Sequence, residues 1–275
     1  MRIQRLAATT GLVALALSGV SLGQGGAPTY AKLGMITLLQ TLNGSEVSRM
    51  ASGFFNAPAQ PLSAIPGSTT AARGVCFVTA LTAGQEPPPG QGPDGAGPKA
   101  LDAGERLTIR GGGHDLGAAE RMVMDSGPIK FINYIAADLP ELNGDLLLDI
   151  PGATPGFPAM TGVAFPTMPP AMDLQASTPL SAITKSTTFS WTAGSSGNLV
   201  ILSGDGKAGE KDANFSCMAA DDGRFAFPAD TKAEMDKLGF TDGHLTNVGR
   251  IAGSSHVVGD ALLVISVIRM TLYGK

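Results

Sequence analysis

The chain lacks any cluster of lysine and arginine, and this absence argues against one large class of partner. It has 19 basic and 23 acidic residues, and only 15% of its 275 residues are charged. Nucleic-acid-binding proteins generally present a basic patch or stripe, and electrostatic attraction to an anionic membrane needs a polybasic segment. We therefore expect no nucleic acid among the partners of this protein, and no polybasic contact with a membrane surface.

No apolar run in the sequence has the length and continuity of a membrane-spanning helix. Such a helix needs about 20 mostly apolar residues, and the N-terminal run GLVALALSGVSLG is interrupted by serine and glycine. Arg2 and Arg5 precede this run and small residues end it, which is typical of a signal peptide cleaved before Gln24. The sequence thus predicts that residues 1–23 are removed. We expect a protein that is not integral to a membrane and that is secreted, periplasmic or held in the cell envelope.

Turn-forming residues are abundant, and the composition favours β-structure. Removal of residues 1–23 leaves 252 residues with 17 basic against 23 acidic side chains, and the whole chain has 37 glycines and 19 prolines. Many short apolar runs are bounded by turns, and only one helix is indicated. We therefore predict an all-β protein in which residues 24–275 form a single β-sandwich domain.

Several segments of this domain can be assigned from local patterns. Two apolar runs separated by Asn43-Gly44 predict an N-terminal hairpin over residues 30–56. The Pro/Gly-rich residues 82–100 fit a long loop and an interdomain linker equally well. The nearly continuous apolar run Ala261–Tyr273 predicts a central strand that is covered on both faces.

Two further segments predict a hairpin and a helix. In TTFSWTAGSSGNLVILSGDG, the apolar alternation on both sides of a Gly/Ser turn predicts a hairpin that starts with the strand of Trp191. Thr231 lies three residues before Glu234, which is the spacing of a capping box, and Gly239 suits a helix C-terminus. These signals predict a short helix near residues 231–238.

Cys76 and Cys217 are the only cysteines, and an exported chain meets an oxidising compartment. We predict a disulfide between them, with two separately buried thiols as the alternative. The bond would close a loop of about 140 residues, for which the chain-entropy model gives a stabilisation of roughly 5 kcal/mol. The two Cα atoms must then lie within about 7 Å of each other.

Four polar residues are weak candidates for a site. Asp221 and Asp222 could contribute to a calcium site, but two adjacent carboxylates are too few for the six to eight ligands of this ion, and Asp-Gly between apolar runs predicts a turn. His114 and Asp115 follow three glycines, yet neighbouring side chains of an extended segment point in opposite directions. The sequence also lacks a nucleophile elbow and a phosphate loop. We therefore predict no catalytic residue, no metal and no cofactor.

Phe189, Trp191, Phe225 and Phe227 allow two interpretations. Exposed in a row, they could form a platform for a sugar. Trp191 lies on an alternating strand with large apolar neighbours, and a buried Trp beside an inter-sheet disulfide is familiar from immunoglobulin-like sandwiches. We therefore expect these four aromatic side chains in the core.

The order of several short segments resembles a class of uncharacterised secreted bacterial β-sandwich proteins. The matching segments lie within residues 75–235 and are LDAGERLTI, GDLLLDIPGATPGFPAMTGVAFP, TTFSWTAGSSGNLVILSG and FSCMAADDGRFAFPAD. The resemblance implies an immunoglobulin-like sandwich and export to the envelope or the medium. It implies no catalytic residues.

The leading functional hypothesis is an exported, non-enzymatic β-sandwich with a structural or binding role in the cell envelope. Its partner would be an envelope protein or a glycan. A carbohydrate-binding module or adhesin is the first alternative, and a hydrolase on a sandwich scaffold that uses His114 or His256 is the second.

Overall fold

The computed structural model describes residues 29–42, 46–61, 74–80, 99–126, 129–140, 144–195 and 197–273. The predicted signal peptide lies outside these ranges, as does nearly all of the Pro/Gly-rich stretch over residues 82–100. Within the described ranges, no helix has the length and apolar character needed to span a membrane.

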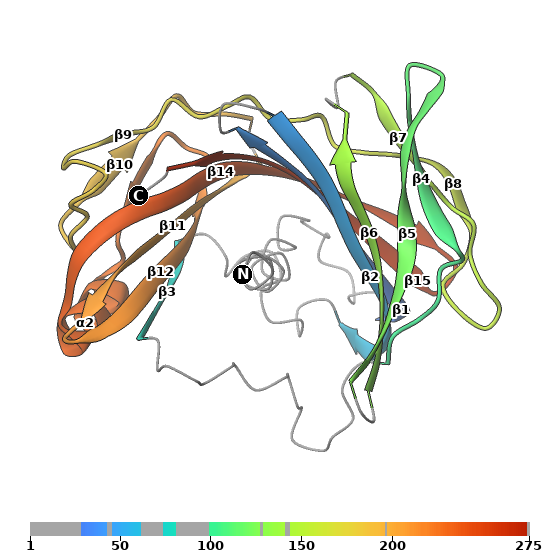
Figure 1. Ribbon diagram of the computed structural model, residues 1–275, viewed down its shortest axis with the longest axis horizontal. Coiled ribbons are helices and arrows are strands. Elements are labelled where there is room, and N and C mark those ends of the chain that lie inside the picture. Colours follow the sequence, from blue (N-terminus) through green and yellow to red (C-terminus); the bar gives the residue numbers. More distant parts are fainter. Residues whose placement is uncertain are drawn as a thin grey trace.

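The described residues form two sheets and one helix (Figure 1). In spatial order, the larger sheet consists of β3 (Val75–Ala80), β12 (Lys211–Ala220), β11 (Leu199–Ala208), β14 (Phe240–Val258), β15 (Ala261–Leu272), β1 (Thr29–Leu42), β2 (Glu46–Pro61), β6 (Ile129–Leu139), β5 (His114–Ser126), β4 (Arg106–Gly111), β7 (Leu146–Ile150) and β8 (Met160–Ala164). The smaller sheet consists of β13 (Arg224–Ala226), β10 (Thr188–Ser190) and β9 (Gln175–Ala176), and α2 spans Ala229–Leu238. Neighbouring strands pair antiparallel, except that β1 runs parallel to β15.

The large sheet arches, so that its two faces have different surroundings. The small sheet and α2 lie outside the arch at one end, and β7 and β8 lie outside it at the other (Figure 1). We call the face that these elements cover the outer face; it carries Val200, Leu202 and Leu263. The opposite face, which carries Ile201 and Ile268, is the inner face. These assignments follow from the register of the paired strands.

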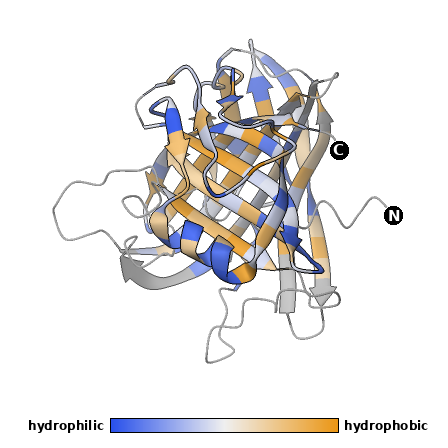
Figure 2. Ribbon diagram, turned by 90° about the vertical axis from the view of Figure 1, so that its left-hand side faces the viewer, coloured by the Kyte–Doolittle hydropathy of each residue, from blue (hydrophilic) through white to orange (hydrophobic). Residues whose placement is uncertain are grey.

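Two large apolar cores lie on the outer face. One includes Leu38, Phe54, Leu148 and Leu263, and joins the central strands to the strands that curl back at the β8 end. The other lies under the small sheet and α2, and contains Val200, Leu202, Phe215 and Met235 together with the aromatic residues of β10 and β13. Figure 2 shows this side of the molecule, where the mostly hydrophilic helix lies over strands rich in hydrophobic residues.

The prediction of a central strand over residues 261–273 is confirmed. β15 lies between β14 and β1 and is buried on both faces. Leu263, Ile265 and Val267 belong to the first large core, whereas Ile268 and Met270 pack in a smaller cluster on the inner face. A strand that is buried on both faces carries apolar residues at nearly every position, which explains the nearly continuous apolar run.

The prediction of an all-β protein with one short helix is confirmed for the described residues, but the immunoglobulin-like sandwich is not. Twelve strands join in a single arched sheet, whereas an immunoglobulin-like domain divides about seven to nine strands between two packed sheets. β1 and β2 pair as an antiparallel hairpin at the centre of this sheet. The predicted hairpin after Trp191 is wrong, because β10 belongs to the small sheet and β11 to the large one.

The helix starts earlier than the sequence predicts. α2 begins at Ala229, Pro228 occupies the N-cap position, and no side chain caps the first turn. Thr231 therefore lies inside the helix, where its backbone N–H donates to the carboxylate of Asp230, and the predicted capping box is wrong. The C-terminal signal is confirmed, because Gly239 adopts the left-handed conformation with φ 63° and ψ 44°, which glycine reaches at little cost.

Candidate functional site

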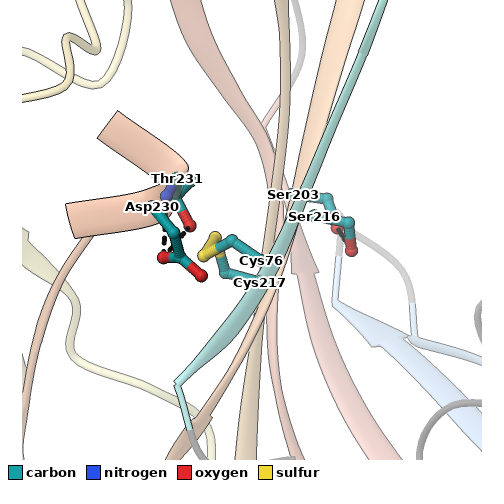
Figure 3. Close-up of a disulfide and its surroundings, with 6 residues drawn as sticks. All are labelled: Cys76, Ser203, Ser216, Cys217, Asp230 and Thr231. Carbon is teal, nitrogen blue, oxygen red and sulfur yellow. Dashed lines mark hydrogen bonds between the residues drawn. A yellow bond between two sulfur atoms is a disulfide. The ribbon is translucent and has the colours of Figure 1, made fainter. Parts of the chain in front are cut away.

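The predicted disulfide is present and joins two adjacent strands. Cys76 on β3 is paired with Cys217 on β12, and their Cα atoms are 4.0 Å apart. The bond lies on the outer face next to the start of α2, whereas Ser203 and Ser216 lie on the inner face (Figure 3). Both cysteines pack in the same apolar core as Trp191, as expected. It fastens an edge strand to its neighbour within one sheet and does not connect two sheets.

Asp221 lies at the centre of a buried polar network. It follows β12 directly, and its Oδ1 accepts a hydrogen bond of 2.8 Å from Nε1 of Trp191. Its Oδ2 lies 3.0 Å from Nε of Arg250 on β14. The two groups form an ion pair, but they are not oriented for a hydrogen bond between these two atoms. The side chains of Asp221 and Arg250 are only 0% and 3% exposed. Both charges are therefore desolvated and depend on each other.

Backbone carbonyls complete the network around Arg250. Its guanidinium donates to the carbonyl of Thr192, and to those of Ala171 at 3.3 Å and Pro170 at 3.5 Å. Gly194 packs so closely on Asp221 that a Cβ atom at this position would overlap Oδ2. These contacts fix the connection between β10 and β11 to the sheet below it. The carboxylate that resembled a metal ligand in the sequence is thus already occupied by Arg250 and Trp191.

The other three weak candidates are exposed and are not brought together. Asp222 is exposed in the turn between β12 and β13, and its carboxylate accepts a hydrogen bond from the backbone N–H of Arg224. His114 and Asp115 lie at the tip of the β4–β5 hairpin, behind Gly112 and Gly113 in left-handed conformations. Among the described residues, no group of three or more His, Cys, Asp or Glu side chains could hold a metal ion.

His256 has one polar neighbour. Its Nε2 lies 3.3 Å from Oγ of Ser254, two residues earlier on the same face of β14. A serine nucleophile also needs a group that orients the histidine, and no carboxylate contacts His256 in the part of the chain that the structure describes. The pair is therefore a local contact in a strand and not an assembled triad.

The four aromatic residues that could have formed a sugar platform are buried. Phe189, Trp191, Phe225 and Phe227 belong to the core under the small sheet. The three phenylalanine rings pack against one another, with centroids 6.0 Å apart for Phe189 and Phe227 and 5.6 Å apart for Phe225 and Phe227. They stabilise the attachment of the small sheet to the large one and are not accessible to a glycan.

A second polar network, which was not predicted from the sequence, surrounds the buried side chain of Tyr134. The hydroxyl group of this β6 residue accepts a hydrogen bond from the N–H of Ala103 and lies 2.9 Å and 2.8 Å from Asp102 Oδ1 and the Gly104 carbonyl. Arg121 on β5 pairs with the other oxygen of Asp102 at 2.9 Å. Burial, assisted by Asp102, raises the pKa of Tyr134 to about 12. The network holds the segment before β4 over the first core, and an aromatic residue with a polar tip inside an apolar strand is its one signal.

An ion pair connects neighbouring strands at the far end of the sheet. Arg110 on β4 contacts both carboxylate oxygens of Asp149 on β7, at 2.6 and 2.8 Å. Burial opposes the charged form of Asp149, but hydrogen bonds from the N–H of Gly162 and from Arg110 outweigh it and lower the pKa of this carboxyl. This pair supports the curled part of the sheet.

The remaining feature is a set of exposed apolar side chains. Eight large apolar residues with described side chains are exposed: Phe77, Met122, Val123, Met124, Ile135, Val257, Val258 and Leu272. The strand register places six of them on the inner face, and only Val123 and Val258 on the outer face. Met122, Met124 and Ile135 lie on the neighbouring strands β5 and β6, whereas the other three lie on β3, β14 and β15. Contiguous exposed apolar residues commonly mark contact with a partner. The inner face is therefore the candidate binding surface.

No protein-family model matches the chain, and no curated protein matches it.

Proposed function

We propose that this chain is an exported, non-enzymatic β-protein with a structural or binding role in the cell envelope. The observation that carries the proposal is the distribution of exposed apolar side chains, six of eight of which lie on the inner face. The Cys76–Cys217 disulfide supports export, because such bonds persist in oxidising compartments.

The two polar networks support a structural role for the carboxylates of Asp221 and Asp102. Asp221 is engaged by Arg250 and Trp191, and Asp102 by Tyr134 and Arg121. Each of these groups fastens a loop to a strand. A catalytic carboxylate needs access to a substrate, and the side chain of Asp221 is 0% exposed.

An envelope protein fits the inner face better than a glycan does. Sugar binding typically uses exposed aromatic rings, and Phe77 is the only aromatic residue among the eight exposed apolar side chains. The others are aliphatic side chains and methionines, and methionine adapts readily to the surface of a protein partner.

We also propose that the sandwich character predicted from the sequence is confined to one end of the molecule. There, β3, β12, β11 and β14 pack through a common core against the small sheet of β13, β10 and β9. The smaller immunoglobulin-like domains likewise pack a sheet of four strands against a sheet of three. In this protein, however, the disulfide lies within one sheet and does not join the two.

Fractionation combined with cross-linking tests the proposed function. Tagged protein is expressed in a bacterium with two membranes, cross-linked in the cells and recovered from each compartment. Val257 and Val258 offer a matched pair, because both are exposed, adjacent and on opposite faces. We expect protein outside the cytoplasm with a cross-linked envelope partner, which Val257→Ser weakens and Val258→Ser leaves unchanged. Retention in the cytoplasm, or equal effects of the two substitutions, would contradict the proposal.

A further inference from the structure

β5 has an open edge over its second half. Its pairing with β4 ends at Arg106 and Glu120, and one more hydrogen bond joins the N–H of Arg121 to the carbonyl of Glu105. β6 continues to pair with the opposite edge as far as Ser126. In the described part of the chain, no strand pairs with the other edge from Met122 to Ser126. This segment is therefore one strand of a two-stranded ribbon that extends beyond the sheet.

The side chains of this edge are apolar on both faces of the ribbon. Met122, Val123 and Met124 are 44%, 48% and 44% exposed. Natural edge strands are usually protected from pairing by a charge, a proline or a bulge. Between Met122 and Met124 there is no such residue, so the open edge combines unpaired backbone groups with exposed apolar side chains.

The direction of the unpaired backbone groups follows from the last bond to β4. Successive residues of a strand direct their N–H and C=O groups to opposite edges. Because the N–H of Arg121 points to β4, those of Val123 and Asp125 point to the same, open edge. A strand that pairs there in antiparallel orientation can therefore exchange two hydrogen bonds with Val123.

The sequence of this edge is complementary to itself. In an antiparallel pair centred on Val123, Val123 lies opposite its own copy and Met122 lies opposite Met124. In the same register the backbone of Arg121 lies opposite that of Asp125, and these two residue types carry opposite charge. Arg121 already contacts Asp102 through one nitrogen, but a guanidinium has five N–H donors and keeps others for a second carboxylate.

We propose that two copies of this chain associate edge to edge through β5, antiparallel and about a twofold axis at Val123. Each copy presents the same strip to the other, as a closed twofold dimer requires. The contact adds the ribbon of one sheet to that of the other by strand addition. Since only about five residues on each side take part, the interface is smaller than that of standard stable complexes and the dimer forms in a concentration-dependent manner.

Charge at the twofold axis gives the sharpest test. Sedimentation velocity over a wide concentration range is applied to the oxidised protein from residue 24 onward, with the wild type, Val123→Lys, Val123→Glu and the control Val123→Thr. We expect the wild type and the control to dimerise, and either charged variant to raise the dissociation constant by about tenfold or more, because like charges meet at the axis. An equimolar mixture of the two charged variants should recover the dimer.

Cysteine pairs test the register without relying on charge. A mixture of Met122→Cys and Met124→Cys should form a disulfide between copies faster than either variant alone, because directly opposite positions are closer than diagonal ones. A wild type that stays monomeric at the highest concentration would overturn the proposal, as would charged variants that dimerise like the control. Monomeric protein that instead binds phosphatidylcholine vesicles would also overturn it and would assign this strip to a lipid surface.

Discussion

Replacement of Asp221 by asparagine should destabilise the protein strongly, whereas the same change at Asp222 should not. Asp221→Asn keeps the size of the side chain and an acceptor for Nε1 of Trp191, but removes the charge beside Arg250. The guanidinium would then remain buried at 3% exposure without a counterion. Loss of one partner of a buried ion pair typically costs about 3–5 kcal/mol.

The lower end of this range applies here, because Arg250 keeps its carbonyl acceptors at Ala171, Pro170 and Thr192. We therefore expect a loss of about 3 kcal/mol in the free energy of unfolding. For a domain of this size such a loss lowers the melting temperature by roughly 6–12 °C. Asp222→Asn changes an exposed carboxylate in a turn, so its effect should stay within about 0.5 kcal/mol.

Urea unfolding followed by far-ultraviolet circular dichroism measures both variants. Trp191 is the only tryptophan, and its fluorescence gives a local signal from the same network. We expect a lower midpoint for Asp221→Asn, with an unchanged slope of the unfolding free energy against urea concentration. Equal midpoints for the two variants would refute it, because the two residues would then have the same environment in the folded protein.

Three further perturbations test other parts of the fold. A Cys76→Ala/Cys217→Ala double substitution should lower the free energy of unfolding by up to about 5 kcal/mol, because the disulfide joins residues separated by 141 positions. An unchanged urea midpoint would contradict a stabilising role of the disulfide. Tyr134→Phe should lower the free energy of unfolding by about 1–3 kcal/mol, because the N–H of Ala103 loses its acceptor. The control Tyr273→Phe, whose hydroxyl has no partner among the described residues, should lower it less. Equal losses of stability in the two variants would contradict a stabilising network around Tyr134. Because the pKa of Asp149 is lowered in the folded state, this carboxyl contributes stability that is fully present above its ordinary pKa of 3.8 and is lost as the pH falls through the lower, folded-state pKa. Asp149→Asn should therefore make the free energy of unfolding less dependent on pH in this range. An unchanged pH dependence would contradict the role of Arg110.

Features that depend on local patterns could be predicted from the sequence. The nearly continuous apolar run of β15 marks a strand buried on both faces, and Gly239 marks the end of the helix. The pairing of Cys76 with Cys217 could be predicted because they are the only two cysteines and the N-terminal sequence predicts export. In each case a few neighbouring residues, or a single possible partner, carry the whole signal.

Features that depend on distant pairing could not be predicted. The parallel contact between β1 and β15 joins the first and last described strands, and nothing in either segment specifies the other. The hairpin after Trp191 was wrong for the same reason, because a buried pair from β14 and the end of β12 holds the connection between two sheets. The sequence placed Asp221 in a turn and could not show that Arg250 neutralises it. An arginine inside the apolar segment NVGRIAG was the available signal of a buried charge.

The intact mass of the protein recovered from outside the cytoplasm, after alkylation without reduction, tests export and the disulfide together. Export with signal cleavage and a Cys76–Cys217 bond predicts the mass of residues 24–275 with no alkyl group, and two alkyl groups after reduction. Recovery only from the cytoplasm, at full length and with both thiols alkylated before reduction, would contradict the proposal of an exported protein stabilised by this disulfide.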